Sequence, residues 1–190
     1  MNEPDWSMEK ATPARIDEML ALNYAIYPEE WHVGRSFVEA VMAKNPQVYN
    51  ILRTPAGVKG IFSIFPLPAG PYEQVLSGDL EEGELASHLL DYDRPRRVRL
   101  YLISIIVDIH DPLRKAYARA IVQAIPAELR RLAELGIEVE EIGAIAITED
   151  GNRILRRIGF TAKGEQESFG ECYPIYRASP EDVVQAITLT

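Results

Sequence analysis

The residues best placed for chemistry lie where an apolar segment gives way to a helical pattern. Asp111 and Pro112 suit the start of a helix, because Asp is a good N-cap residue and Pro lacks the N–H that a first helical residue leaves unpaired. Arg114 and Lys115 follow within the first turn. Such a terminus attracts anions through its free N–H groups and the helix dipole. The sequence therefore predicts either a phosphate-binding helix terminus or an ordinary capped helix that binds nothing.

The elements around this terminus form a strand–helix–strand unit. Residues 99–108 are apolar on both faces and rich in β-branched side chains, which is typical of a strand covered on both sides. Apolar residues then recur at three- and four-residue steps as far as Leu135, which predicts an amphipathic helix that Pro126 kinks or divides and Gly136 ends. A second apolar strand follows at Ile142–Thr148. The two strands should therefore be parallel, with a right-handed crossover.

The rest of the chain supplies helices and hairpins around this unit. Residues 1–10 are expected to be a loose lead-in, and residues 11–190 a single domain. The other expected elements are helices at 14–25 and 36–44, a hairpin of strands at 48–53 and 58–65, a chain break at 66–71, an acidic segment at 72–93 that is helical in pieces, a closing hairpin at 160–162 and 171–177, and a final helix or strand at 180–190. This order predicts the α/β (α+β) class.

Composition narrows the class of protein. A chain of 190 residues with 47% hydrophobic side chains is long enough for one domain with a proper core, and its net charge of −9 argues against nucleic acid as a partner. The N-terminus resembles no signal peptide and the apolar runs are only strand-length, so we expect a cytoplasmic protein without membrane contact. Cys172 is the single cysteine, and the three histidines are scattered. We therefore expect neither disulfides nor a metal site.

The order of these elements resembles the GCN5-related N-acetyltransferases (the GNAT superfamily). The resemblance covers residues 11–178, and its most specific local segments are Ile103–Asp108 with the helix that follows, and Thr148–Phe160, which ends in Gly-Phe. It implies a single GNAT-like domain with a mixed central sheet of six to seven strands flanked by helices. In that fold the parallel strands, here Leu100–Asp108 and Ile142–Thr148, splay apart.

The resemblance also implies an acyl-CoA, with acetyl-CoA as the expected acyl donor. The pantetheine arm would lie between the splayed strands and pair with backbone groups of the first strand. The pyrophosphate would lie at the start of the next helix, where the best match to the family's turn is Leu113–Ala118, with Ala in place of the usual Gly residues. Regular helix-terminal amides and basic side chains would then form the cradle. The implied cofactor-binding residues are Ile105, Ile106, Val107, Arg114, Lys115, Ala116 and Ala118.

Acyl transfer to an amine needs a base for the attacking nitrogen, a donor for the tetrahedral oxyanion and an acid for the CoA thiolate. In the family the oxyanion donor is commonly a backbone N–H of the splayed strand. The acid is frequently a Tyr four residues before the Gly of Gly-Phe, but here Leu155 occupies that position. Tyr173, Tyr176 and Cys172 in the closing hairpin are alternatives, of which Tyr173 is our candidate. Each of the three also suits a packed or surface strand position.

Two polar residues of the first strand are further catalytic candidates. Strict alternation places Ser104 and Asp108 on one face, where Ser104 would hold a water or the thiol, or else be a buried serine bonded to backbone. Asp108 ends the strand at the cleft mouth and is a candidate base. The other candidates for the base are Glu29, Glu30 and His110.

The loop between the first two helices borders the acceptor site in the family. On this sequence it holds Tyr27, Glu30 and Trp31, which would bind a small substrate, unless the aromatic rings pack against the sheet instead. The resemblance thus implies an N-acyltransferase that transfers an acetyl group to an amine of a small molecule or peptide by direct attack in a ternary complex. Members of the family often form homodimers, so a homodimer is one of the oligomeric states left open.

Two other functions remain open at this point. A GNAT-like module that binds acyl-CoA, or regulates, without catalysis is suggested by the missing Gly residues and by Leu155. A different nucleotide-binding α/β protein is the third, although the sequence contains neither Gly-x-Gly-x-x-Gly nor Gly-Lys-Ser/Thr. The sequence does not identify the acceptor.

Overall fold

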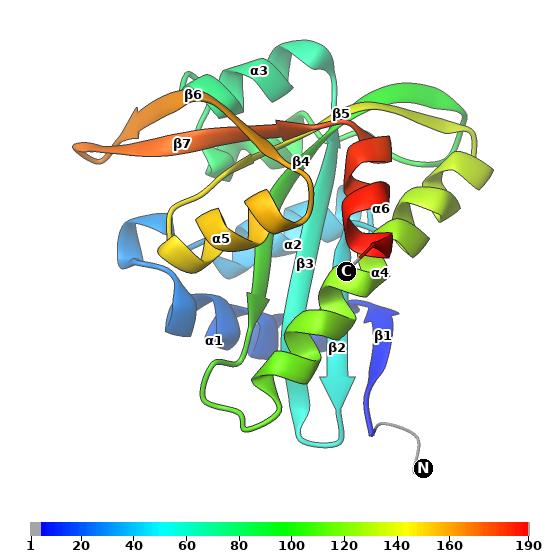
Figure 1. Cartoon of the computed structure of the whole chain (residues 1–190), viewed down its shortest axis with the longest axis vertical. Coiled ribbons are helices and arrows are strands. Elements are labelled where there is room, and N and C mark those ends of the chain that lie inside the picture. The colour runs from blue at the N-terminus through cyan, green and yellow to red at the C-terminus, as the bar shows by residue number, and fades with distance from the viewer. Residues whose placement is uncertain (1–4, 190) are drawn as a thin grey trace.

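A seven-stranded mixed sheet runs through the molecule, with helices on both of its faces (Figure 1). The computed structural model describes residues 5–189. In chain order the elements are β1 (Ser7–Lys10), η1 (Pro13–Arg15), α1 (Ile16–Ile26), η2 (Glu29–Trp31), α2 (Arg35–Lys44), β2 (Tyr49–Thr54), β3 (Gly57–Leu67), α3 (Ala69–Ser77), η3 (Glu82–Ser87), β4 (Arg96–Val107), α4 (Arg114–Glu134), β5 (Ile137–Ile145), α5 (Glu149–Arg157), β6 (Thr161–Ser168), β7 (Glu171–Ala178) and α6 (Pro180–Thr188). The predicted class and the mixed sheet of six to seven strands are confirmed.

The strand order is β1-β2-β3-β4-β5-β7-β6. β4 and β5 are parallel and are joined through α4, as the strand–helix–strand pattern predicted. All other neighbouring pairs in this sheet are antiparallel. The closing hairpin lies beside β5, and the final segment is a helix, one of the two alternatives that the sequence allowed.

β4 and β5 separate halfway along their length. They pair from Arg96 with Ile137 as far as Tyr101 with Gly143, and β4 then continues unpaired on that side to Val107. β5 instead continues beside β7, up to the pair Ile145–Ile175. The predicted splay of the two parallel strands is therefore present, and it opens a gap in the middle of the sheet.

A β-bulge in β4 lies at the edge of this gap. Ser104 pairs with Ser63 on β3, but Leu102 pairs with the adjacent Ile64, so Ile103 is an extra residue. The extra residue reverses the alternation of side chains along β4. As a result Leu102 and Ser104 lie on opposite faces, which corrects the strict alternation expected from the sequence.

The two faces of the sheet are covered by different helices. Phe37 of α2 packs against Phe65 on one face of β3, with 6.2 Å between the ring centroids. α4 covers the opposite face so closely that a Cβ at Gly60 would overlap Ile121, and α6 lies beside α4 (Figure 1). Within the described part of the chain, the helices are too short or too polar to cross a membrane.

Some predicted boundaries are wrong for physical reasons. Ser7–Lys10, expected in the loose lead-in, forms β1 and pairs with β2, whereas residues 1–4 lie outside the described residues. Pro126 does not divide α4, because the buried stripe of this helix packs on the sheet on both sides of the proline. The chain break expected at 66–71 is also wrong: β3 continues to Leu67, and α3 begins at Ala69 because Pro71 lies in its first turn, where a missing N–H costs no bond.

The start of β5 also lies earlier than predicted, at Ile137 instead of Ile142. Its first half contains Glu138 and Glu140, which look unsuited to a covered strand. Both are exposed and form ion pairs with Arg97 of the neighbouring β4, at 3.2 and 3.5 Å. Cross-strand charge pairs therefore stabilise a segment whose composition alone does not indicate a strand.

Candidate functional site

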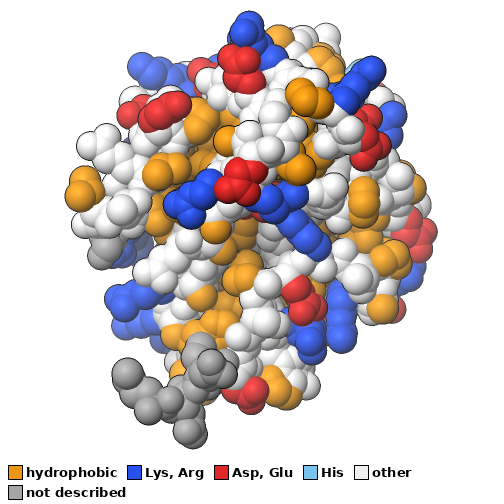
Figure 2. Space-filling model, turned by 90° about the vertical axis from the view of Figure 1, so that its right-hand side faces the viewer, with side chains coloured by type: hydrophobic (Ala, Val, Ile, Leu, Met, Phe, Trp, Pro, Cys, Tyr) orange, Lys and Arg blue, Asp and Glu red, His pale blue; other side chains and the backbone are white. Residues whose placement is uncertain are grey.

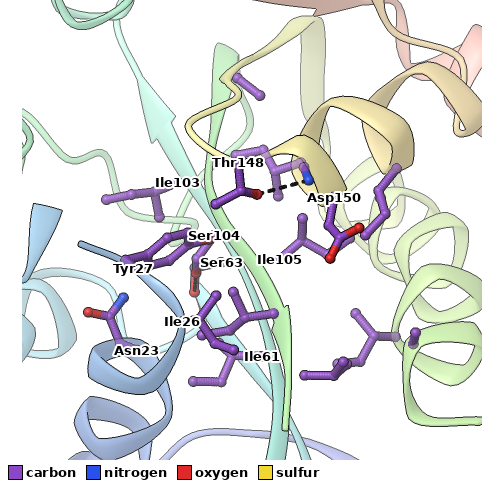
Figure 3. A pocket seen from close by; sticks show the side chains of 18 of the residues that line it. Asn23, Ile26, Tyr27, Ile61, Ser63, Ile103, Ser104, Ile105, Thr148 and Asp150 are labelled. Carbon is purple, nitrogen blue, oxygen red and sulfur yellow. Dashed lines mark hydrogen bonds between the residues drawn. The ribbon is translucent and has the colours of Figure 1, made fainter. Parts of the chain in front are cut away.

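A cavity of about 930 Å³ occupies the gap between β4 and β5. Its walls come from both faces of the sheet, with α1 and α2 on one side and α4 and α5 on the other (Figure 3). A volume of this size is in the usual range for small-molecule and cofactor sites. The strand ends that the sequence singled out thus border the cavity.

The main chain of β4 presents alternate residues to the gap. Asp108 donates its N–H to the carbonyl of Lys59 on β3 at 2.9 Å, so the antiparallel register directs the peptide groups of Ile106 to β3 as well. Ile105 and Val107 therefore turn their N–H and C=O groups toward the gap, as the resemblance implied. Ile106 is a correction, because it lines the cavity only through its side chain.

Basic side chains gather at one end of the cavity, which we call the basic end. Its members are Arg114, Lys115 and Arg119 of α4 together with Arg153 and Arg157 of α5. Elsewhere on the side of the molecule that carries α4 and α6, positive and negative side chains are interspersed (Figure 2). Asp150 of α5 also lines the cavity and pairs with Arg153 at 3.1 Å, so the five cations at the basic end exceed the acidic side chains beside them.

The start of α4 differs from the expected phosphate cradle. Asp111 is not the N-cap residue: its Oδ1 accepts the N–H of Leu113 at 2.9 Å, and the helix begins only at Arg114. The carbonyls of Asp111 and Leu113 accept the N–H groups of Arg114 and Ala116, at 3.1 and 2.8 Å. These amides are already bonded, so basic side chains rather than free amides dominate this end. Ala118 lines the cavity, but Ala116 faces a different pocket, beside Trp6.

α5 is fixed against the cavity by its own polar contacts. Thr148 caps the helix by accepting the N–H of Gly151 at 3.0 Å (Figure 3). The buried Tyr176 donates to Asn152 and accepts from Arg156 of α5, both at 2.9 Å. These two hydrogen bonds explain why a hydroxyl is buried at Tyr176, and no catalytic role is needed to explain it. Leu155, at the position of the family's usual acid, lines the cavity with an apolar side chain.

The opposite end, which we call the inner end, lies on the α1 side of β4. It is lined by Tyr27, Tyr49, Ser63, Ser104 and Glu82. Ser104 donates a 2.9 Å hydrogen bond to Ser63, and the Tyr27 side chain points toward this pair (Figure 3). The backbone N–H of Ile105 interacts with the Tyr27 hydroxyl, while burial raises the pKa of Tyr27 and the nearby Glu82 adds to that rise. The predicted cavity positions of Tyr27 and Ser104 are therefore consistent with the structure.

Glu82 is the charged residue of the inner end that the sequence did not reveal. Its Oε1 accepts a 2.5 Å hydrogen bond from the hydroxyl of Tyr101. Burial raises the pKa of Glu82 to about 7, although the bond from Tyr101 acts in the opposite direction. Glu81 and Glu84 form a capping box at the start of η3, which fixes the turn that holds Glu82. That sequence pattern locates the turn, but it does not show which acidic residue faces the cavity.

Several predicted site residues lie outside the cavity wall. Asp108 is bound to Lys59 at 2.9 Å, and this bond lowers the pKa of Asp108. Tyr173 is not among the lining residues: it packs edge-on against Trp31 and donates to Glu171 at 3.2 Å. The remaining members of this group are exposed, namely Glu29, Glu30, His110 and Cys172.

Of the three loop residues predicted to bind substrate, Tyr27 and Trp31 line the cavity and Glu30 does not. The indole Nε1 of Trp31 is buried and has no hydrogen-bond partner within the described residues. A second edge-on ring contact is made with Phe169 of the β6–β7 turn, at 5.3 Å between centroids. The loop between α1 and α2 thus contributes aromatic surface to the cavity, whereas its acidic residues point to solvent.

Comparisons with known proteins identify the fold. No family model and no curated protein sequence matches the chain. Among solved structures, the loading GNATL domain of CurA from Lyngbya majuscula aligns at a TM-score of 0.65 and 12% identity, covering 93% of this chain and 98% of that one. The GNAT-like decarboxylase GphF in complex with isobutyryl-CoA aligns at 0.61 and 15%, covering 92% and 99%. YncA from Salmonella typhimurium with its cofactor acetyl-CoA aligns at 0.56 and 14%, covering 93% and 95%. The chain therefore has the fold of the GCN5-related N-acetyltransferases.

Proposed function

We propose that the protein is an acyl-CoA-dependent N-acyltransferase that transfers an acetyl group from acetyl-CoA to an amine by direct attack in a ternary complex. The observation that carries this proposal is the cavity through the β4–β5 gap, with bare main-chain groups along one wall and basic side chains at one end. Two proteins of the same fold, YncA and GphF, are bound to acetyl-CoA and isobutyryl-CoA. Their sequence identity is low, so the proposal rests on the cavity of this chain.

The residues of the cavity suit the parts of an acyl-CoA. Arg114, Lys115 and Arg119 would pair with its phosphates, because guanidinium and ammonium groups form strong charge-assisted hydrogen bonds with them. The main-chain groups of Ile105 and Val107 would bond the amides of the pantetheine arm, as an added strand does. The thioester would then reach the inner end of the cavity.

Two donors at the inner end suit the acyl-transfer step. The N–H of Ile105 faces the gap beside the Tyr27 hydroxyl, and an oxyanion that takes the place of this hydroxyl would be stabilised by the N–H in the tetrahedral intermediate. The Tyr27 hydroxyl is protonated at neutral pH and lies at the inner end of the cavity, so it would supply a proton to the departing CoA thiolate. This places on Tyr27 the role that Leu155 leaves vacant.

CoA binding by calorimetry tests the donor half of the proposal. Substituting Arg114→Ala together with Lys115→Ala should raise the Kd for CoA by about tenfold or more, since two charged contacts with phosphates are lost. Arg130→Ala is the matched control, because Arg130 is an exposed residue of the same helix and does not line the cavity. Binding of S-acetylpantetheine, which lacks the pyrophosphate, should be the same in all three proteins. Equal CoA affinity in the double variant and the control would refute the assignment of the basic end.

Release of free CoA from acetyl-CoA tests the acyl transfer itself, with amines of different size and charge as acceptors. Leu155 favours a second function, an acyl-CoA-binding module without catalysis, because the family's usual acid is absent from the cavity wall. Tight CoA binding with no amine-dependent CoA release would support that second function. No CoA binding would refute both.

A further inference from the structure

Glu82 is the isolated charge of the inner end. The other charged side chains that line the cavity, five basic residues and Asp150, belong to α4 and α5 on the far side of β4. Within the described residues, Glu82 is paired with no cation, and its hydrogen bond comes from the neutral Tyr101. Glu82 is half-buried at the cavity wall, and a partly desolvated carboxylate without a cationic partner is costly, so a cation from outside the chain would complete this end of the cavity.

The surroundings of Glu82 limit the kind of cation that fits. Tyr27 and Tyr49 lie close enough for the Glu82 charge to raise their pKa values, and their aromatic rings attract cations. The rest of the wall on this side of β4 is mostly apolar, with Met19, Leu20, Phe37, Val38 and Ile61, and its polar groups include the Asn23 amide and the Trp31 indole N–H. A second positive charge on the ligand would find no second carboxylate among the residues that line this end.

We propose that the acceptor is a small primary amine with a single positive charge and an apolar body, and that Glu82 binds its ammonium group and removes the proton that blocks attack. This inference rests on the proposed N-acyltransferase function and names its substrate class and its base. Asn23 of α1 supports it, because its Oδ1 is buried in the same wall and has no hydrogen-bond partner within the described residues. It can accept a second N–H of the ammonium group.

The proton balance of this step is complete without another reactant. One ammonium proton passes to the Glu82 carboxylate and from there to solvent through the cavity. The freed nitrogen lone pair forms the C–N bond at the thioester carbonyl, and the C–S bond breaks. The second nitrogen proton ends on the CoA sulfur, so the products are a secondary amide, neutral CoA thiol and one released proton.

The protonation state of Glu82 suits the removal of a proton from the ammonium group. The titratable side chains that face it are Tyr27 at the end of α1, Tyr49 on β2 and Tyr101 on β4, all of them neutral below pH 9. Because its pKa is about 7, a large fraction of Glu82 is a carboxylate at neutral pH. A general base is most effective when its pKa lies close to the working pH. A bound ammonium group would favour the carboxylate further.

Glu82→Gln is the direct test, because glutamine keeps the shape and the acceptor for Tyr101 but removes the charge. With hexylamine or 2-phenylethylamine as acceptor, we expect kcat/KM for the amine to fall by about 100-fold or more, and the rise of the rate near pH 7 to disappear. Affinity for CoA should stay unchanged. Glu134→Gln, an exposed carboxylate at the end of α4, is the matched control and should behave as the unsubstituted protein.

A second variant and a binding assay keep the test independent of folding and of turnover. Tyr101→Phe removes the hydrogen bond that favours the Glu82 carboxylate, so the pH–rate profile should move to higher pH. 2-Phenylethylamine should raise the melting temperature of the CoA-bound protein, and Glu82→Gln should abolish this rise.

The outcomes separate this inference from the proposed function. Amine acylation that Glu82→Gln leaves intact, or a preference for spermidine over 2-phenylethylamine, would overturn the inference and leave the N-acyltransferase standing. Stabilisation by 2-phenylethylamine that requires Glu82, without CoA release, would support the amine site and overturn the transferase. CoA binding with neither amine stabilisation nor CoA release would overturn both.

Discussion

The hydroxyl of Tyr101 and the carboxylate of Glu82 form a 2.5 Å hydrogen bond between β4 and the start of η3. Both residues come from parts of the chain that contact the cavity only because β4 and β5 separate after Tyr101. The bond favours the carboxylate form of Glu82, whereas burial opposes it, and burial has the larger effect. This balance makes the inner end of the cavity sensitive to pH.

The folding stability of the protein should fall as the pH rises through the titration of Glu82. Its pKa in the folded state is about 7, above its ordinary value of 4.5, so the stabilisation is complete below about pH 4.5 and is lost toward pH 7 and above. The shift corresponds to an upper limit of roughly 3 kcal/mol. Melting temperatures of Glu82→Gln should therefore decline less between pH 5 and pH 8 than those of the unsubstituted protein and of Glu134→Gln. Parallel pH curves for all three would show that Glu82 titrates normally.

Hydrogen exchange should distinguish three consecutive amides of β4. The N–H of Ile106 is directed to β3, whereas those of Ile105 and Val107 face the gap. We expect slow exchange at Ile106, the fastest exchange at Val107, and intermediate exchange at Ile105, whose N–H is in contact with the Tyr27 hydroxyl, all measured by NMR. Addition of CoA should then slow exchange at Ile105 and Val107 in particular. Equal protection of all three amides without CoA would contradict this register.

Gly60→Ala should destabilise the protein through the packing of α4. The new Cβ would overlap the Ile121 side chain, and forced overpacking of a core costs about 1–3 kcal/mol. Gly70→Ala is the matched control, because a Cβ there meets no neighbour within 4 Å. Urea unfolding of the two variants provides the comparison. A Gly60→Ala protein as stable as the control would mean that Ile121 and α4 shift at little cost.

Lys59→Met should weaken the turn between β4 and α4 in a pH-dependent way. Lys59 contacts the carboxylates of Asp108 and Asp111 at 2.9 and 3.2 Å. The pKa of Asp108 is lowered chiefly by Lys59, and that of Asp111 chiefly by the N–H of Leu113 with a smaller effect of Lys59. Stability from these groups is present above about pH 4 and is lost as the pH falls through their lowered pKa values.

We therefore expect the substitution to lower the melting temperature by about 3 °C at pH 7, and by less at pH 3, where the carboxylates are protonated. Lys163→Met is the control, because Lys163 is exposed on β6. A loss at pH 3 as large as that at pH 7 would point to packing of the Lys59 stem rather than to its charge.

The architecture could be predicted from the sequence because it depends on local patterns. The apolar segment at 99–108, the periodic helix after it and the order of the hairpins are properties of neighbouring residues, and each is present in the structure. The start of α4 could not be located in this way. Asp111 can cap a helix or close a turn, and its contact with Lys59 on β3, far along the chain, decides for the turn.

The catalytic candidates depended on long-range contacts to a greater degree. Asp108 was a reasonable base from its place at a strand end, but the same Lys59 pairs with it. Tyr173 was a reasonable acid from its hairpin, but it packs on Trp31. Glu82 resembles its acidic neighbours in sequence and differs from them only in facing a cavity that distant strands enclose. Such residues become visible when the tertiary fold is known.

The bulge at Ile103 decides which part of the cavity a substitution in β4 affects. The bulge reverses the alternation of side chains, so Tyr101 and Ser104 lie on the same face of the sheet although they are three positions apart. Beyond Ser104, the pairing of β4 with β3 is shifted by one residue from the pairing before the bulge. Substitutions before the bulge alter the chemistry around Glu82, while substitutions after it alter the wall of the gap. If the proposed acyl transfer holds, substitutions near Glu82 would change the acceptor site without disturbing the main chain that would hold the acyl donor.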